Sequence, residues 1–226
     1  MCALRVEGED RALETSILLV AAGCAFAYLL FTAQPEGALR STLKTASVAL
    51  LAGLAFLSDA PVLLGCGLLL CAVGDYCLSR EGEGAFMAGI GAFAAGHLAY
   101  VALFLTAPGG DFAQLAQMPR LAVVLGLALL GLIMVRVLAP RAGALKGAVL
   151  AYIPIILSMG VAAATLPAQG AVAWALPAAM AFIASDVVLA FETFVLPDGL
   201  ALRRIAPYAV WPLYWGAQIG FFFAFW

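Results

Sequence analysis

The sequence predicts an all-α membrane protein, a polytopic bundle of about eight transmembrane helices. Hydrophobic residues make up 65% of the 226-residue chain, charged residues make up only 11%, and the mean hydropathy is +1.09. Soluble domains are nearer half apolar and a quarter charged. The apolar residues also fall into runs of about the 17–25 residues that a helix needs to cross the hydrocarbon. We therefore expect one integral membrane domain over residues 1–226, with a short polar N-terminal segment over 1–15.

Eight apolar runs are expected to form the helices. They cover residues 16–33, 43–58, 61–79, 84–106, 119–138, 144–165, 170–191 and 208–226. The first run follows a segment of mixed charge, and no small-x-small cleavage pattern comes after it. It is therefore expected to stay as a spanning helix rather than to act as a signal peptide.

Short polar segments separate the runs. Asp59-Ala60-Pro61 predicts a tight turn before the third helix, and the segment 80–84 predicts a polar turn before the fourth. Within the fourth run, Ala88, Ala92 and Gly96 recur every four residues. Small residues at this spacing let two membrane helices approach closely, so this face is expected to pack against protein.

The basic residues predict the orientation in the membrane. Those in or beside the odd-numbered connections are Arg40, Lys44, Arg80, Arg136, Arg141, Lys146, Arg203 and Arg204, and those on the opposite side are Arg5, Arg11 and Arg120. Loops rich in lysine and arginine stay in the cytoplasm, so both termini are expected outside. A net charge of -2 without a basic run argues against binding nucleic acid.

Two aspartates and one histidine stand inside the apolar runs. Asp75 lies in Val73–Ser79, His97 is the only histidine of the chain, and Asp186 lies in Ala184–Ala190. Ionisable groups at membrane depth cost about 2.5–3.5 kcal/mol each by insertion measurements, so they are candidates for function. Both aspartates fall near the cytoplasmic ends of their helices. We therefore expect one polar site in the cytoplasmic leaflet.

Further polar residues are expected at or near the same depth. They are Lys44 at the start of the second helix, Tyr152 in the sixth, and Tyr214 and Gln218 in the eighth, with His97 and Gln218 nearer the midplane. Lys44 suits a substrate phosphate, while the tyrosines and the glutamine can orient a water or an ether oxygen. Structural roles stay open: the lysine can reach to the interface, and the histidine can hydrogen-bond between helices.

The two aspartates also suit acid–base chemistry. Two carboxylates close together in a low dielectric do not both ionise cheaply, so Asp75 and Asp186 are expected to share a proton. Such a pair supplies a general acid beside a general base. His97 assists them or holds one of them in place. A weak small–Asp–x–x–Leu repeat at 74–78 and 185–189 also suggests two related halves that bring the carboxylates face to face.

Other site chemistries have little support. The five cysteines, Cys2, Cys24, Cys66, Cys71 and Cys77, show no C-x-x-C spacing and are expected to be reduced, small hydrophobes. The sequence has neither a G-x-S-x-G nucleophile elbow nor a G-x-x-x-x-G-K-[ST] phosphate loop.

Several short motifs, in order and spacing, resemble the YhhN/transmembrane protein 86 family, the lysoplasmalogenases. They are Gly74-Asp75-x-x-Leu78, Phe93-x-x-x-His97-x-x-Tyr100, Phe182-x-x-Ser185-Asp186-x-x-Leu189-Ala190 and Tyr214-x-x-x-Gln218, with Lys44, Tyr152 and Met159 also at positions like the family's. The resemblance covers most of the chain from Lys44 onward. Family members are multi-pass proteins of bacterial inner membranes and of the animal endoplasmic reticulum. The resemblance therefore implies a bacterial inner-membrane location.

The resemblance also implies an activity and a set of site residues. Characterised members hydrolyse the vinyl ether bond of lysoplasmalogens to a fatty aldehyde and glycerophosphoethanolamine or glycerophosphocholine. The expected partners are this lysophospholipid substrate and membrane lipids, and no metal or organic cofactor is implied. The residues expected in catalysis are Asp75, Asp186 and His97, and those expected to bind substrate are Lys44, Tyr100, Tyr152, Tyr214 and Gln218.

Two other functions stay open from the sequence. Intramembrane acids and prolines such as Pro154, Pro177 and Pro212 also occur in transporters, so a proton-coupled lipid carrier is the alternative. An enzyme needs a site open to one leaflet, whereas a carrier needs access to both faces. A non-catalytic scaffold or lipid sensor would not need both aspartates.

Overall fold

The computed structural model describes residues 2–32, 34 and 37–226, with side chains described from residue 11 onward. In this part of the chain the secondary structure is entirely helical. The helices are α1 (Cys2–Phe31), α2 (Ala38–Leu57), α3 (Val62–Leu78), α4 (Glu83–Thr106), α5 (Arg120–Leu138), α6 (Lys146–Ala163), α7 (Ala175–Phe194) and α8 (Ala201–Phe225). Short 3₁₀ helices cover Phe112–Ala116, Gly143–Leu145 and Ala171–Trp174.

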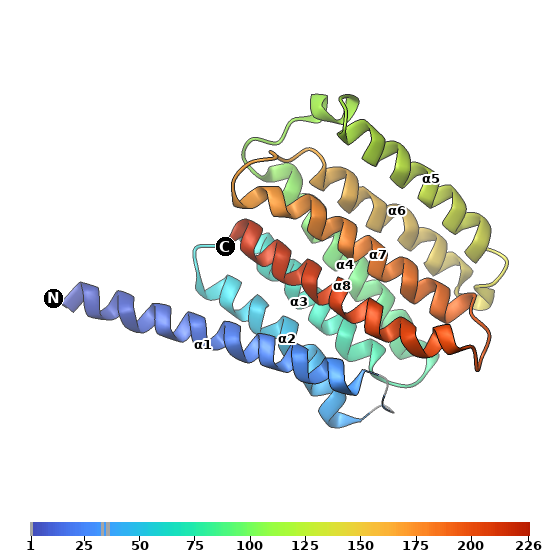
Figure 1. Cartoon of the computed structure of the whole chain (residues 1–226), viewed down its shortest axis with the longest axis horizontal. Coiled ribbons are helices and arrows are strands. Elements are labelled where there is room, and N and C mark those ends of the chain that lie inside the picture. Colours follow the sequence, from blue (N-terminus) through green and yellow to red (C-terminus); the bar gives the residue numbers. More distant parts are fainter. Residues whose placement is uncertain (1, 33, 35–36) are drawn as a thin grey trace.

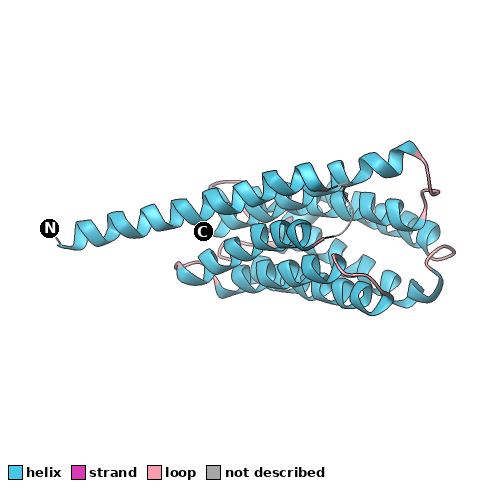
Figure 2. Ribbon diagram, turned by 90° about the horizontal axis from the view of Figure 1, so that it is seen from below, coloured by secondary structure: helices cyan, strands magenta, loops and turns pink. Residues whose placement is uncertain are grey.

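Seven of these helices close a ring, and α5 lies outside it. Helices α1 to α4 pack in chain order, α4 then packs against α6, and α6, α7 and α8 follow in order. Helix α8 closes the ring against α1 and also touches α2 and α3. Helix α5 packs against α6 at the edge of the bundle (Figure 1). The helices run side by side, and the start of α1 projects beyond them (Figure 2).

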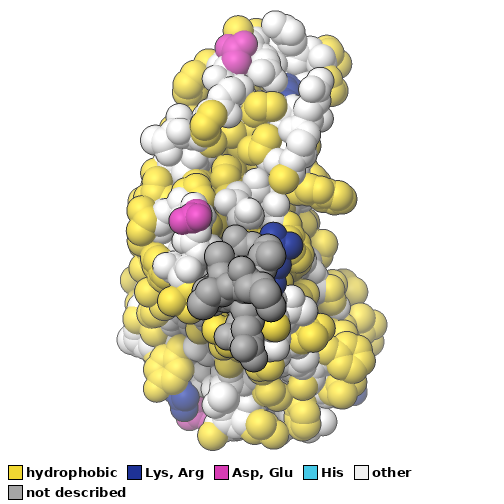
Figure 3. Space-filling model, turned by 90° about the vertical axis from the view of Figure 1, so that its left-hand side faces the viewer, with side chains coloured by type: hydrophobic (Ala, Val, Ile, Leu, Met, Phe, Trp, Pro, Cys, Tyr) yellow, Lys and Arg dark blue, Asp and Glu magenta, His cyan; other side chains and the backbone are white. Residues whose placement is uncertain are grey.

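Length and composition fit a membrane protein. Five helical segments among the described residues are long and apolar enough to span, namely Arg11–Phe31, Glu83–Thr106, Arg120–Leu138, Gly143–Ala163 and Ala171–Phe194, and Val62–Leu78 is a shorter apolar helix. On the face seen in Figure 3, hydrophobic side chains are widespread and charged groups are few. The all-α membrane bundle is thus confirmed, while the count of eight spans stays a prediction.

The predicted boundaries hold for most helices but fail at three. Helix α1 begins at Cys2 rather than at 16, α2 begins at Ala38 rather than at 43, and α8 begins at Ala201 rather than at 208. In all three helices the missed turns contain charged residues, so hydropathy placed them outside the apolar run. Helix α8 also continues through Pro207 and Pro212, as α6 does through Pro154. Packing against neighbouring helices allows such prolines in membrane helices.

Helices α3 and α4 make the most extensive helix contact, and only part of the predicted small-residue face lies in it. Ala88 is exposed, whereas the buried face of α4 contains Gly89, Phe93, Gly96 and Tyr100. A Cβ atom built at Gly96 would lie 2.9 Å from the Cys71 sulfur. The prediction thus holds at Gly96 and fails at Ala88, because the buried positions follow alternating steps of three and four residues rather than a strict step of four.

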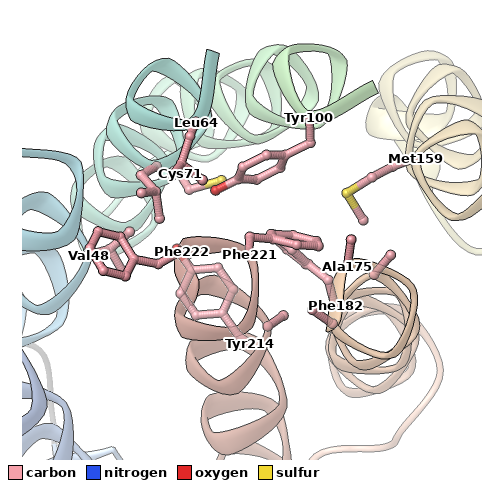
Figure 4. Close-up of a cluster of buried hydrophobic side chains, with 14 of the residues drawn as sticks. Val48, Leu64, Cys71, Tyr100, Met159, Ala175, Phe182, Tyr214, Phe221 and Phe222 are labelled. Atoms are coloured by element: carbon pink, nitrogen blue, oxygen red, sulfur yellow. The ribbon is translucent and has the colours of Figure 1, made fainter. Parts of the chain in front are cut away.

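Aromatic side chains fill the middle of the ring. Tyr100, Phe182, Phe221 and Phe222 are fully buried and converge from α4, α7 and α8 (Figure 4). The Phe182 ring lies 6.4 Å from the Phe221 ring. This aromatic layer separates the two ends of the bundle interior.

The described cysteines carry free thiols, as expected. Cys24, Cys66, Cys71 and Cys77 form no disulfide, and Cys71 is buried. The side chain of Cys2 lies outside the described residues.

Candidate functional site

A cavity of about 300 Å³ opens at one end of the bundle. Its walls come from all eight described α-helices. Most lining residues lie toward the C-terminal ends of α1, α3, α5 and α7 and toward the N-terminal ends of α2, α4, α6 and α8, and the cavity reaches the middle of α6, α7 and α8 at Leu157, Ile183 and Tyr214. This volume is at the lower end of that of small-molecule sites. The polar residues therefore gather at the end of the odd-numbered connections, as predicted from their depth.

Asp75 lies on the cavity wall with two partners. Its side chain is 1% exposed, and its Oδ1 atom lies 3.1 Å from the Lys44 Nζ atom. The Tyr214 hydroxyl donates a hydrogen bond to the other carboxylate oxygen, at 2.6 Å. Three helices, α2, α3 and α8, thus meet at one carboxylate. Lys44 turns into the bundle to pair with Asp75, so it does not serve merely as an interfacial lysine.

Asp186 lies on the same cavity wall with a partner of its own. The Tyr152 hydroxyl donates to its Oδ2 atom at 2.6 Å. Asp75 and Asp186 are close enough to interact electrostatically. No hydrogen bond joins the two carboxylates within the described residues. The two carboxylates therefore line one cavity, each held by its own tyrosine rather than by a direct contact with the other, and the sharing of one proton stays a prediction.

His97 lies behind Tyr152 rather than on the cavity wall. Its Nδ1 atom is 2.6 Å from the Phe93 carbonyl oxygen, which can only accept, so Nδ1 carries the proton. The Tyr152 hydroxyl lies 3.4 Å from the same nitrogen. The ring also packs on Phe182, with centroids 4.5 Å apart. His97 therefore reaches Asp186 only through Tyr152, which makes it a positioning residue in this geometry.

Tyr100 and Gln218 lie deeper than the cavity. Both side chains are fully buried, and the Tyr100 hydroxyl donates to the Gln218 amide oxygen at 2.5 Å. Neither lines the cavity wall, so the structure does not bring these two predicted substrate-binding residues to the site. Instead, their hydrogen bond ties α4 to α8. Tyr214 and Gln218 do share a buried face of α8, as predicted, but only Tyr214 reaches the cavity.

The remaining wall divides into an apolar region and a charged rim. Leu130 and Met134 of α5 and Leu157 of α6 extend the cavity outside the ring of helices. The rim carries Arg40 and Glu192, neither of which was singled out from the sequence as a site residue. Arg40 lies one turn before Lys44 on α2, so the sequence spacing could have placed Arg40 near the predicted site.

Comparison with known proteins assigns the family. The sequence model of the YhhN family matches residues 39–225, from the first turn of α2 to the end of α8. The chain belongs to the YhhN family. The match includes each of the predicted site residues and leaves out α1. No curated protein and no solved structure shows significant similarity to this YhhN protein.

Metal binding has no obvious ligand set in this YhhN protein. Among the side chains that the structure describes, no three histidine, cysteine, aspartate or glutamate residues come together as metal ligands would. The carboxyl and basic side chains that line the cavity are instead those of Asp75, Asp186 and Glu192 and of Lys44 and Arg40.

Proposed function

We propose that this protein hydrolyses the vinyl ether bond of lysoplasmalogens. The products are a fatty aldehyde and glycerophosphoethanolamine or glycerophosphocholine. The observation that carries the proposal is the presence of two carboxylates, Asp75 and Asp186, from separate helices on the wall of one largely apolar cavity. The family to which the chain belongs includes lysoplasmalogenases, which supports the same reaction.

The reaction needs a proton donor first. A carboxylic acid delivers its proton to the outer vinyl carbon, which leaves an oxocarbenium ion at the carbon bonded to oxygen. We assign this step to Asp186, whose partner is the neutral hydroxyl of Tyr152. That hydroxyl fixes the orientation of the carboxyl group toward the cavity, and a positioned acid typically contributes about 10²–10⁴-fold to the rate.

The second step needs a negative charge and a base. Asp75 suits it, because Lys44 compensates its charge and Tyr214 fixes its orientation. The carboxylate stabilises the oxocarbenium ion and takes a proton from water as the water adds to the cationic carbon. The resulting hemiacetal then collapses: its bond to the glycerol oxygen breaks, that oxygen takes up a proton, and the hydroxyl proton is lost as the aldehyde forms.

The apolar wall fits the hydrocarbon chain of such a substrate. Leu130, Met134 and Leu157 lie on the α5 side, away from the charged rim. Helix α5 packs outside the ring, next to the surrounding lipid. A single alkenyl chain can therefore lie between α5 and α6 while its polar end reaches the two aspartates.

The same geometry favours a hydrolase over a carrier. A carrier needs access from both faces, whereas the residues that line the cavity lie mostly toward one end of the bundle. Continuous helices run through Pro154 and Pro212, so these prolines do not produce the broken helices typical of many transporters. A scaffold or lipid sensor would not need two acids oriented into a cavity.

The test is aldehyde release by the purified protein in detergent. We expect hydrolysis of alkenyl-lysophosphoethanolamine but not of its ester-linked analogue. Asp75→Asn and Asp186→Asn should each lower turnover by at least about 10²-fold, while Asp59→Asn, at an exposed position, should not. Each variant must match the wild type in its chromatographic elution and in its unfolding transition, so that a loss of turnover is not a loss of folding. Retained turnover in either site variant, or no aldehyde from the wild type, would refute the proposal.

A further inference from the structure

The rim of the cavity carries two opposite charges that the proposed reaction does not use. Arg40 precedes Lys44 by one helical turn, about 6 Å along α2. Glu192 follows Asp186 by six residues, about 9 Å along α7. Both side chains are half-buried and line the same cavity as the aspartates, toward its outer end. They are close enough to interact electrostatically.

Contacts with α1 hold Arg40 in place. Its guanidinium donates to the Thr32 carbonyl oxygen at 3.1 Å and lies over the Tyr28 ring, 5.8 Å from the centroid. The Tyr28 ring in turn packs on Trp211, with centroids 4.3 Å apart. Tyr28, Thr32 and Trp211 all line the cavity. The Arg40 guanidinium is therefore held by contacts with residues of the cavity wall.

Lys44 is less suited to bind a phosphate than the sequence suggested. Its ammonium group is engaged by Asp75 at 3.1 Å, and a phosphate there would compete with the carboxylate. Arg40 is the next cation along the wall. A planar guanidinium also matches the oxygens of a phosphate with paired hydrogen bonds, which a lysine cannot do.

Glu192 supplies the opposite charge. The cations that act on it are Arg203 and Arg40, and Arg203 is itself engaged by Asp198 at 2.5 Å. A ligand with a phosphate alone would bring a second negative charge beside Glu192. A ligand with a phosphate and an ammonium group would place an opposite charge beside each of the two rim residues, Arg40 and Glu192.

We infer that Arg40 and Glu192 form a headgroup subsite for a zwitterionic phospholipid, with the phosphate at Arg40 and the ammonium at Glu192. This inference rests on the proposed function, because it places a lysophospholipid in the cavity. The three carbons of glycerol then run from the rim toward the aspartates, and the chain at the first carbon enters the apolar region. The subsite makes Arg40 and Glu192 specificity-determining residues.

Binding of ligands that cannot be cleaved separates this inference from the hydrolysis. The ligands are saturated 1-alkyl ethers of equal chain length, namely alkyl-lysophosphoethanolamine, alkyl-lysophosphatidic acid and alkylglycerol. Their dissociation constants are measured for the wild type and for Arg40→Gln, Arg40→Lys and Glu192→Gln. Arg204→Gln and Glu81→Gln, at exposed positions of the same end, serve as matched controls.

We expect a pattern that depends on the headgroup. Arg40→Gln should weaken both phosphate-bearing ligands by roughly tenfold or more and change alkylglycerol by less than about twofold, with Arg40→Lys in between. Glu192→Gln should weaken only the phosphoethanolamine ligand and should leave or improve binding of the phosphate-only ligand. Equal weakening of all three ligands, or the same values as the controls, would overturn the subsite.

The hydrolysis assay then gives an independent result. A protein that shows this binding pattern but releases no aldehyde would refute the proposed reaction and keep the subsite. A protein that releases aldehyde without the pattern would refute the subsite alone.

Discussion

The buried ion pair between Lys44 and Asp75 makes a quantitative prediction about stability. Asp75 is 1% exposed, and the Lys44 side chain is 19% exposed. Lys44→Met leaves the carboxylate buried, with the Tyr214 hydroxyl as its remaining partner. Removing one partner of a buried pair costs about 3–5 kcal/mol. Because the tyrosine still donates its hydrogen bond, we expect the lower end, about 3 kcal/mol.

The double variant tests whether the pair is the cause. An asparagine at position 75 carries no charge and still accepts from Tyr214, so Lys44→Met/Asp75→Asn should recover most of the lost stability. Asp75→Asn alone should cost less than Lys44→Met, because the lysine can turn toward the headgroups. The two single variants are therefore expected to be strongly non-additive.

The assay is unfolding by SDS in mixed micelles, followed by tryptophan fluorescence. Lys146→Met, at an exposed position at the start of α6, is the control and should change the free energy of unfolding by less than about 0.5 kcal/mol. Two results would refute this role of the ion pair. One is a free energy of unfolding for Lys44→Met equal to that of the control. The other is a loss of free energy of unfolding in the double variant equal to the sum of the losses in the two single variants.

Two further predictions concern the site and its support. Tyr152→Phe removes the hydroxyl that orients Asp186, so turnover should fall about tenfold while the protein stays folded, and unchanged kcat would contradict this role. Gly74→Ala would place a Cβ atom 2.6 Å from the Phe93 ring and should destabilise the protein by about 1–3 kcal/mol. Gly91→Ala, whose Cβ would have nothing within 4 Å, is its control, and equal unfolding midpoints for the two variants would argue against this packing.

The sequence was sufficient to place the two aspartates at one end of the bundle. Asp75 and Asp186 lie near the ends of the third and seventh helices, which run in the same direction, so alternating spans bring them to the same side. Hydropathy and helix direction contain this information. They also place Lys44, Tyr152 and Tyr214 at that end, and the structure puts all three on the cavity wall.

The partners of each aspartate could not be predicted in this way. They depend on which helices are neighbours, and hydropathy does not encode that α8 touches α3 or that α5 lies outside the ring. Hence Tyr214 pairs with Asp75, and Tyr152 with Asp186, where the sequence suggested that the two carboxylates meet directly. Gln218 is likewise fully buried away from the cavity wall, because packing between distant helices pairs it with Tyr100.

The aromatic rings beside the cavity have a consequence for the membrane as a whole. The rings of Phe93, Phe182 and Tyr214 lie with centroids 5.2–6.4 Å apart, and those of Phe93 and Tyr214 line the cavity. A lipid that enters where the cavity opens would meet these packed rings rather than a path through the bundle. Under the proposed reaction, degradation would deplete ether lipids on one side only, and the compositional asymmetry of the bilayer would change without any flipping of lipid through the protein.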